Sequence, residues 1–73
     1  MTGLPVVSGD QCVKALERLG YRVSRTKGSH MWLVCEGRAP IPVPRHRELD
    51  RGTLRKIIKM ADITIDEFIE LFK

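Results

Sequence analysis

The first periodic stretch of the chain has helical spacing. Within residues 12–19, apolar residues recur at i, i+4 and i+7, which places them on one side of a helix. Ser8 precedes this stripe and Gln11 lies three residues later, the pattern of a capping box. Gly20 follows the last apolar position, where a left-handed residue commonly ends a helix. The pattern predicts a helix over about residues 9–19.

After this helix the apolar period changes to two, which is typical of strands. Alternation predicts strands over about residues 21–27 and 30–35, joined by a turn at the glycine and serine between them. In the second strand, His30 and Trp32 share one face, and Met31 lies on the other.

Three prolines alternate with apolar residues in the next segment, residues 38–44. The N–H groups of alternate strand residues point to the same side, so Pro40, Pro42 and Pro44 leave one edge without donors while the other edge can still pair. We expect an edge strand that pairs with the second strand and blocks further growth of the sheet. The alternative is a loop in the polyproline II conformation.

The last third of the chain returns to helical spacing. Asp50 can cap a second helix, because apolar residues repeat at i, i+3, i+4 and i+7 over residues 54–61. Thr64 and Glu67 form another capping-box pattern, which opens a short amphipathic helix. The apolar stripe of that helix comprises Ile65, Phe68, Ile69 and Phe72.

The element order is α-β-β-β-α with an additional short C-terminal helix. Three antiparallel strands with the helices on one face make a two-layer α+β sandwich. A chain of 73 residues predicts a single domain over residues 1–73, of which residues 1–7 form a flexible segment. The sequence contains neither an apolar run long enough to span a membrane nor a secretory signal pattern, so we expect a cytoplasmic protein. Cys12 and Cys35 are expected to be buried free thiols.

Charge changes the picture by indicating a partner. The net charge is +4, and 12 of the 13 basic residues lie between Lys14 and Lys59, where acidic residues number 4. A compact basic body favours a polyanion such as nucleic acid. The alternative is a soluble surface that happens to be basic.

Few residues could do chemistry. The chain has two histidines, His30 and His46, each next to a turn and among basic residues. Histidine is the side chain best suited to proton transfer near neutral pH, and in a phosphate-binding patch it could deprotonate a ribose 2′-hydroxyl without a metal. With two histidines and no ligand spacing, we expect neither a metal site nor a cofactor. Candidate phosphate contacts are Arg25, Lys27, Arg45, Arg47 and Arg51.

Three motifs in this order resemble the HicA toxins, small mRNA interferases of bacterial toxin–antitoxin pairs. They are Lys27-Gly28-Ser29-His30 opening a strand, Val43-Pro44-Arg45-His46 after the third strand, and Gly52-Thr53-Leu54-Arg55-Lys56-Ile57-Ile58-Lys59 in the second helix. The resemblance extends over about residues 8–72. It implies a fold like the double-stranded RNA-binding domain and translation-independent cleavage of mRNA. It also implies neutralisation by a HicB antitoxin, with the toxin monomeric when free and part of a larger complex when bound.

The resemblance also implies roles for individual residues. His30 is the implied catalytic residue, acting as general base on the 2′-hydroxyl. Lys27, Ser29 and His46 are further candidates for catalysis or substrate binding. Trp32 could stack on a base, but packing or the anchoring of a partner protein is favoured for it. Two other classes stay open: a non-catalytic RNA-binding module, including a degenerate family member, and a regulatory protein that binds an acidic protein.

The sequence departs from the family pattern at two places. Asp62 follows the second helix where the family usually has glycine, so that helix end is expected to differ. The turn after the second strand, residues 35–38, lacks the more usual Pro-Asp-Gly. Neither departure touches the Gly-Ser-His triplet.

Overall fold

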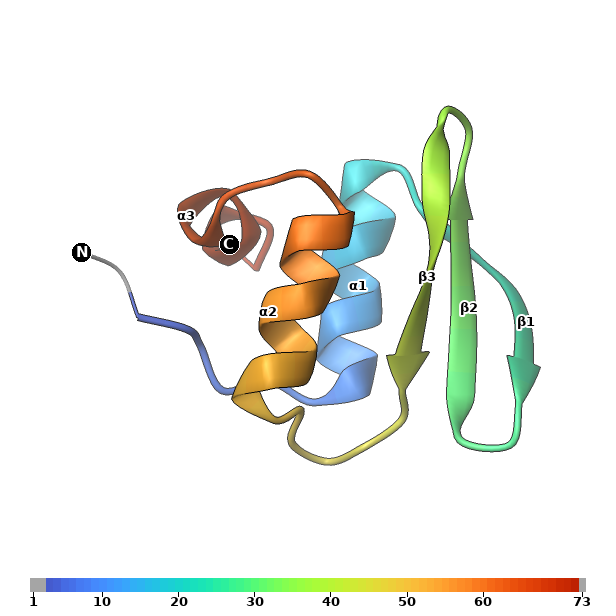
Figure 1. The fold of residues 1–73 in the computed structure, drawn as a ribbon, viewed down its shortest axis with the longest axis horizontal. Coiled ribbons are helices and arrows are strands. Elements are labelled where there is room, and N and C mark those ends of the chain that lie inside the picture. The colour runs from blue at the N-terminus through green and yellow to red at the C-terminus, as the bar shows by residue number, and fades with distance from the viewer. Residues whose placement is uncertain (1–2, 73) are drawn as a thin grey trace.

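The computed structural model describes residues 3–72, which form three helices and a three-stranded antiparallel sheet of order β1-β2-β3 (Figure 1). This arrangement confirms the α+β fold expected from the sequence. Along the chain the elements are α1 (Gly9–Leu19), β1 (Arg22–Lys27), β2 (His30–Cys35), β3 (Arg38–Pro44), α2 (Arg51–Met60) and α3 (Ile65–Glu70).

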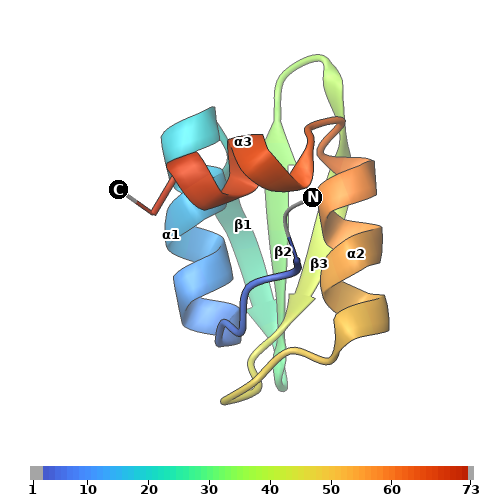
Figure 2. The ribbon, with the colours of Figure 1, turned by 90° about the vertical axis from the view of Figure 1, so that its left-hand side faces the viewer.

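The helices α1 and α2 lie side by side against one face of the sheet, and the other face carries no helix (Figure 1). We call this uncovered side the open face. The helix α3 runs across α1 and α2 on the side away from the sheet (Figure 2). The N-termini of α1 and α2, the β1–β2 turn and the end of β3 all lie at the same end of the molecule, at the bottom of Figure 1. The topology therefore brings the motif-bearing segments together.

The ends of α1 follow the sequence closely. The Ser8 hydroxyl accepts from the Gln11 backbone N–H, and the Gln11 side chain accepts from the Ser8 N–H, which completes the capping box. Gly20 ends the helix with a φ of 116°, a left-handed value that glycine adopts readily. At the start of α1 the backbone comes so close to β3 that a Cβ on Gly9 would overlap the Pro44 carbonyl oxygen. These contacts fix where α1 begins.

The proline-rich segment is an edge strand, as its alternation predicts, and not a polyproline loop. Residues 38–44 pair along β2 only, with Ile41 opposite Leu33 and Val43 opposite Met31. The opposite edge of the sheet is β1, and its burial differs from the expectation. Every residue of β1 is exposed, including Val23 at 38%, and a register shift between Val23 and Arg25 interrupts the alternation.

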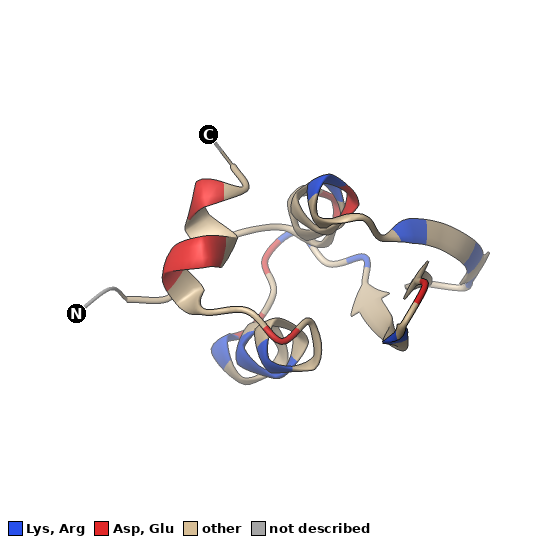
Figure 3. Cartoon of the chain, turned by 90° about the horizontal axis from the view of Figure 1, so that it is seen from above, with Lys and Arg blue, Asp and Glu red and all other residues tan. Residues whose placement is uncertain are grey.

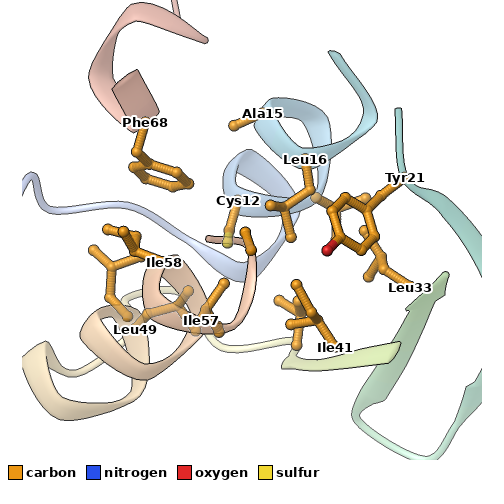
Figure 4. Packing of buried hydrophobic residues seen from close by; sticks show 14 of the residues in the cluster. Cys12, Ala15, Leu16, Tyr21, Leu33, Ile41, Leu49, Ile57, Ile58 and Phe68 are labelled. Carbon is orange, nitrogen blue, oxygen red and sulfur yellow. The ribbon is translucent and has the colours of Figure 1, made fainter. Parts of the chain in front are cut away.

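The core lies between the helix layer and the inner face of the sheet (Figure 4). Leu16 of α1 and Leu33 of β2 are fully buried there, and Phe68 of α3 is fully buried on the other side of α1 and α2, beneath α3 (Figures 2 and 4). The stripe expected for the last helix is only partly buried. Phe72 remains 37% exposed, although its ring meets Phe68 edge-on at a centroid distance of 5.1 Å. Leu71 packs against the core instead, because the chain leaves helical geometry after Glu70.

The segment before α1 lies against the body of the protein. Leu4 packs against the core, and Val7 is 5% exposed. The Val7 carbonyl accepts from the Leu49 N–H at 2.8 Å, which places the segment beside the β3–α2 connection. The flexibility expected of residues 1–7 stays a prediction, and residues 1 and 2 lie outside the described residues.

Each of the two departures from the family pattern includes a residue with a positive φ, and the β2–β3 pairing shifts register between Leu33 and Cys35. Asp62 has a φ of 59°, the left-handed value that glycine would favour, so the end of α2 keeps the expected course. In the β2–β3 turn, Cys35 pairs with Arg38, and Gly37 has a φ of 81°. The expectation that the end of α2 differs is thus wrong.

Both cysteines are free, and they differ in burial. Cys12 is buried, and its burial raises the pKa of its thiol to about 12, so it stays protonated at neutral pH. Cys35 is half-buried, which corrects the expectation of two buried thiols. Among the helices of residues 3–72, none has the length and apolar character needed to cross a membrane.

Candidate active site

The β1–β2 hairpin positions His30 at the end of the sheet. Lys27 pairs with His30 across a two-residue turn, and Gly28 has a φ of 60°, the positive value that a type II′ turn needs at its first central residue. The Ser29 carbonyl accepts a hydrogen bond of 2.6 Å from the Arg45 backbone N–H. The turn is therefore tied to the segment that follows β3.

Strand register places His30 on the open face. Met31 and Leu33 are buried under the helices, so His30 and Trp32 point the other way. Residues opposite one another in an antiparallel sheet share a face. One row across the open face consists of Lys27, His30 and Pro44, and the next consists of Arg25, Trp32 and Pro42.

The imidazole of His30 is open to a substrate. The residue is exposed, and within residues 3–72 no hydrogen bond or ion pair holds its side chain. Lys27 lies beside it on β1 and is likewise exposed. A histidine with a free ring and a neighbouring cation can accept a proton from a group whose phosphate the cation binds.

In the second row, Trp32 is half-buried beneath an arginine. The Arg25 guanidinium carbon lies 5.8 Å from the centroid of the Trp32 ring, within the range of a cation–π contact. Trp32 therefore packs on the open face and not in the core. This contact positions Arg25, because the indole of Trp32 holds the guanidinium charge above the sheet.

The segment after β3 joins the site through α1. The His46 carbonyl accepts from the Gly9 N–H at 2.9 Å, so this segment lies against the first turn of α1. The Arg45 side chain contacts the Asp10 carboxylate, with 3.5 Å between Nε and Oδ1, and both side chains are mostly exposed. Arg45 thus lies at the same end of the molecule as His30, with an acidic side chain beside it.

His46 lies near enough to the start of α2 for its charge to act on Asp50. Hydrogen bonds from Thr53 lower the pKa of the Asp50 carboxyl, and the charge of His46 lowers it further. The Thr53 backbone N–H donates to Asp50 Oδ1 at 2.6 Å, which caps α2. The structure therefore places His46 beside the α2 cap.

A groove of about 560 Å³ runs from His30 along the proline edge of β3 to α2. We call it the β3–α2 groove. Sequence reasoning missed its α2 wall, although four of the wall's residues lie in the third motif, because periodicity alone does not show which helical positions meet a strand edge. Its lining residues are His30, Pro42, Pro44, Asp50, Gly52, Thr53, Lys56, Ile57 and Met60.

Not every candidate residue gathers around His30. Arg51 lines a separate depression with the N-terminal segment, on another side of the α2 N-terminus. Arg47 is exposed in the connection between β3 and α2. Charge is still strongly divided over the molecule, since lysine and arginine mark α2 and β1 while acidic residues mark α3 (Figure 3). Residues 3–72 contain no group of three or more His, Cys, Asp or Glu side chains arranged to hold a metal ion.

Comparison with known proteins agrees with this geometry. Residues 9–63 match the family model described as "HicA toxin of bacterial toxin-antitoxin". A chain in the solved structure "Toxin-Antitoxin complex from Streptococcus pneumoniae" is 34% identical, with a TM-score of 0.71. The similarity covers 78% of this chain and 98% of that chain. Comparison with curated proteins returned no match.

The matched region contains all three motifs and every element except α3. The protein is a small α+β domain that carries an exposed histidine at a hairpin turn, among basic residues. The chain belongs to the HicA toxin family of bacterial toxin–antitoxin systems.

Proposed function

We propose that this protein is the toxin of a type II pair and an endoribonuclease that cleaves mRNA, with His30 as general base. The observation that carries the proposal is the exposed His30 ring between Lys27 and the β3–α2 groove, at the end of the molecule where Arg45 also lies. Membership of the HicA toxin family supports it.

The reaction follows from the chemistry of an RNA strand laid across the open face. His30 takes the proton from a ribose 2′-hydroxyl, and the 2′-oxygen attacks the adjacent phosphorus. The bond from phosphorus to the 5′-oxygen breaks, and that oxygen takes a proton from a general acid or from water. The products are a 2′,3′-cyclic phosphate and a 5′-hydroxyl, and water then opens the cyclic phosphate to a 3′-phosphate. These steps need no metal or cofactor, because every proton and bond is accounted for by RNA, His30, the general acid and water.

Cationic side chains would position the strand and stabilise the phosphorane. Lys27 is nearest to His30 in the sheet register, and Arg25 and Arg45 flank it on β1 and after β3. Ser29 would contribute through the shape of the turn, because its carbonyl accepts from the backbone N–H of Arg45 and so ties the segment after β3 to the turn. His46 is the proposed general acid or substrate contact, and Arg47 and Arg51 would add phosphate contacts further along the strand.

We also infer a protein partner, an antitoxin of the HicB type. The similar chain from Streptococcus pneumoniae comes from a structure described as a toxin–antitoxin complex. The simplest way to silence an exposed catalytic histidine is to cover it. We therefore expect the antitoxin to bury His30 together with Lys27 or Arg45, in a complex larger than the free monomer, inside the cytoplasm.

The deciding experiment uses an RNA with one 2′-deoxyribose at the cleaved position. Loss of the 2′-hydroxyl removes the nucleophile and leaves the phosphates, so binding should persist while cleavage stops. His30→Ala should also stop cleavage without unfolding the protein, since exposed side chains contribute within about ±0.5 kcal/mol. Addition of a chelator should leave the native rate unchanged.

Cleavage of the deoxy-substituted bond, full activity of folded His30→Ala, or loss of activity with chelator would refute the mechanism. RNA binding without cleavage by the native protein would instead identify a non-catalytic RNA-binding module. A protein without salt-dependent affinity for RNA would belong to neither class, because phosphate contacts weaken steeply with salt.

A further inference from the structure

We infer that the β3–α2 groove is a nucleobase site, which holds the base of a nucleotide flanking the cleaved bond while Lys56 binds the adjoining phosphate. The inference rests on the proposed function for its substrate, single-stranded RNA. It adds a binding site that neither the motifs nor the proposed mechanism requires.

Position is the first argument. His30 lies at the mouth of the groove and also on the open face, so it belongs to both surfaces. A strand with its 2′-hydroxyl at His30 must continue on at least one side of that ribose. The groove is the hollow that begins at His30, and its volume of about 560 Å³ lies within the usual range of small-ligand sites, about 300–1,000 Å³.

The walls of the groove suit a flat aromatic ring. On the strand side the groove is lined by half-buried Pro42 and buried Pro44, and neither has a backbone N–H that would need a partner. On the helix side, Ile57 is buried and Met60 is 36% exposed. Apolar walls of this kind accept any base face, because stacking does not depend on base identity.

Gly52 is the second argument, because the fold does not explain a glycine there. Its φ is not positive, and an added Cβ would meet nothing closer than the Asp50 Oδ1 atom at 3.9 Å. A glycine within a helix is less favourable than alanine. Gly9, by contrast, is required by its contact with β3. The missing side chain at Gly52 leaves the groove open.

Charge selects RNA over an apolar peptide as the occupant. Lys56 lines the groove and is exposed, and it is one helical turn from Gly52 on the same side of α2. Lys59 lies one position before Met60 and does not line the groove. Asp50 also lines the groove, and its carboxylate accepts from the Thr53 N–H as the cap of α2. The Lys56 ammonium at the edge of the apolar walls is therefore the charge that matches a base with its phosphate attached.

The test measures the affinity of the native protein for a short, fully 2′-O-methylated RNA, which cannot be cleaved. An abasic position is moved through the strand one nucleotide at a time. At one position, loss of the base should weaken binding about tenfold or more, which corresponds to the lower part of the stacking range of 1–3 kcal/mol. Gly52→Leu should weaken the intact RNA by a similar factor, since leucine fills the groove.

The decisive result is the combination of the two changes. In Gly52→Leu, the abasic RNA should bind as well as the intact RNA, because the base no longer has a site. Leucine is a better helix former than glycine, so unfolding measurements should show that this variant is at least as stable as the native protein. Lys56→Ala should weaken binding about tenfold, while Lys59→Ala, with the same loss of charge on the same helix, should change it less than about twofold.

If the abasic position and Gly52→Leu act independently, or if Lys56 and Lys59 contribute equally, the groove does not hold a base. If Gly52→Leu leaves RNA affinity unchanged and abolishes antitoxin binding, the groove is a protein-docking site and the inference is wrong. None of these readouts requires cleavage, so a failure of the nuclease mechanism would be recognised separately through the deoxy-substituted RNA.

Discussion

The backbone N–H of Arg45 donates to the carbonyl oxygen of Ser29 over 2.6 Å, which joins the segment after β3 to the β1–β2 turn. A second backbone bond, from Gly9 to His46, joins the same segment to the start of α1. The end of the molecule that carries His30 is thus held by main-chain groups. Side chains there can be replaced one at a time without loss of the framework, which makes substitution a clean test of their roles.

The contact between Gly9 and β3 predicts a large effect from a small change. Gly9→Ala places a Cβ against the Pro44 carbonyl, and the backbone must shift to make room. We expect a loss of about 1–3 kcal/mol in the free energy of unfolding, the usual cost of overpacking. The matched control is Gly52→Ala, where the Cβ fits and helix propensity favours alanine by about 0.5–1 kcal/mol. Denaturant unfolding measures both, and equal stability of Gly9→Ala and native protein would contradict the close approach.

Asp62 offers the opposite effect, a stabilising change to glycine. Its φ of 59° is a left-handed value that is unfavourable for residues with a Cβ. Asp62→Gly should stabilise the protein by about 0.5–1 kcal/mol, after the greater freedom of glycine in the unfolded chain is allowed for. Asp62→Asn is the control and should lie between the two, because asparagine tolerates this conformation better than most residues. A lower midpoint of unfolding for Asp62→Gly would show that the aspartate side chain itself holds the end of α2.

The cap of α2 predicts a pH dependence. Thr53 holds the pKa of Asp50 below its ordinary value of 3.8. Because the folded-state pKa is lowered, the stabilisation is fully present above pH 3.8 and is lost as the pH falls through the lower, folded-state pKa. Asp50→Ala should therefore be less stable than the native protein at pH 7, and the difference should shrink in this acid range. Asp50→Asn has no carboxyl to protonate, so its difference from Asp50→Ala should stay constant.

Local signals in the sequence were sufficient for the elements of this fold. Capping boxes at Ser8 and Thr64 set the starts of α1 and α3, and alternating prolines identified the edge strand. The exposure of β1 was not predictable in the same way. The register shift between Val23 and Arg25 depends on pairing with β2, and alternation along one strand does not report it.

The part of the candidate site that lies within one sequence motif was predictable, and the part formed by two separate elements was not. His30 stands out because a histidine follows a Gly-Ser turn, and the register then places Lys27 beside it. The β3–α2 groove depends on how a helix meets a strand edge, so Lys56 and Met60 become neighbours of His30 only in the folded chain. Arg51, in turn, has the right charge and lies beside a different depression.

Trp32 is expected to anchor the antitoxin. Its indole lies half-buried on the open face under Arg25, in the row next to the one that contains His30. Trp32→Ala should weaken the complex about tenfold or more, because buried tryptophans at the centre of an interface are common hot spots. Val23→Ala is the control, since Val23 is an exposed apolar residue that pairs with Leu33 and so belongs to the other face of the sheet. Titration calorimetry with purified antitoxin measures both, and an equal effect of the two changes would place the antitoxin elsewhere.

The contact between Arg45 and Asp10 predicts a substitution that improves RNA binding. The two side chains are mostly exposed, with 3.5 Å between Nε and Oδ1, so their pairing should contribute less than about 0.5 kcal/mol to folding. Asp10 nevertheless competes with phosphate for Arg45. Asp10→Asn removes that competition, and we expect RNA affinity to rise about two- to fivefold at low salt.

Two comparisons separate this local effect from a change in total charge. Asp66→Asn removes the same charge from α3, which lies on the side of α1 and α2 away from the sheet, so affinity should barely change (Figure 2). Arg45→Ala should lower affinity about tenfold, and the dependence of log affinity on log salt should become shallower by about one phosphate contact. If Asp10→Asn and Asp66→Asn raise affinity equally, Arg45 does not contact the strand and its ion pair with Asp10 has no part in RNA binding.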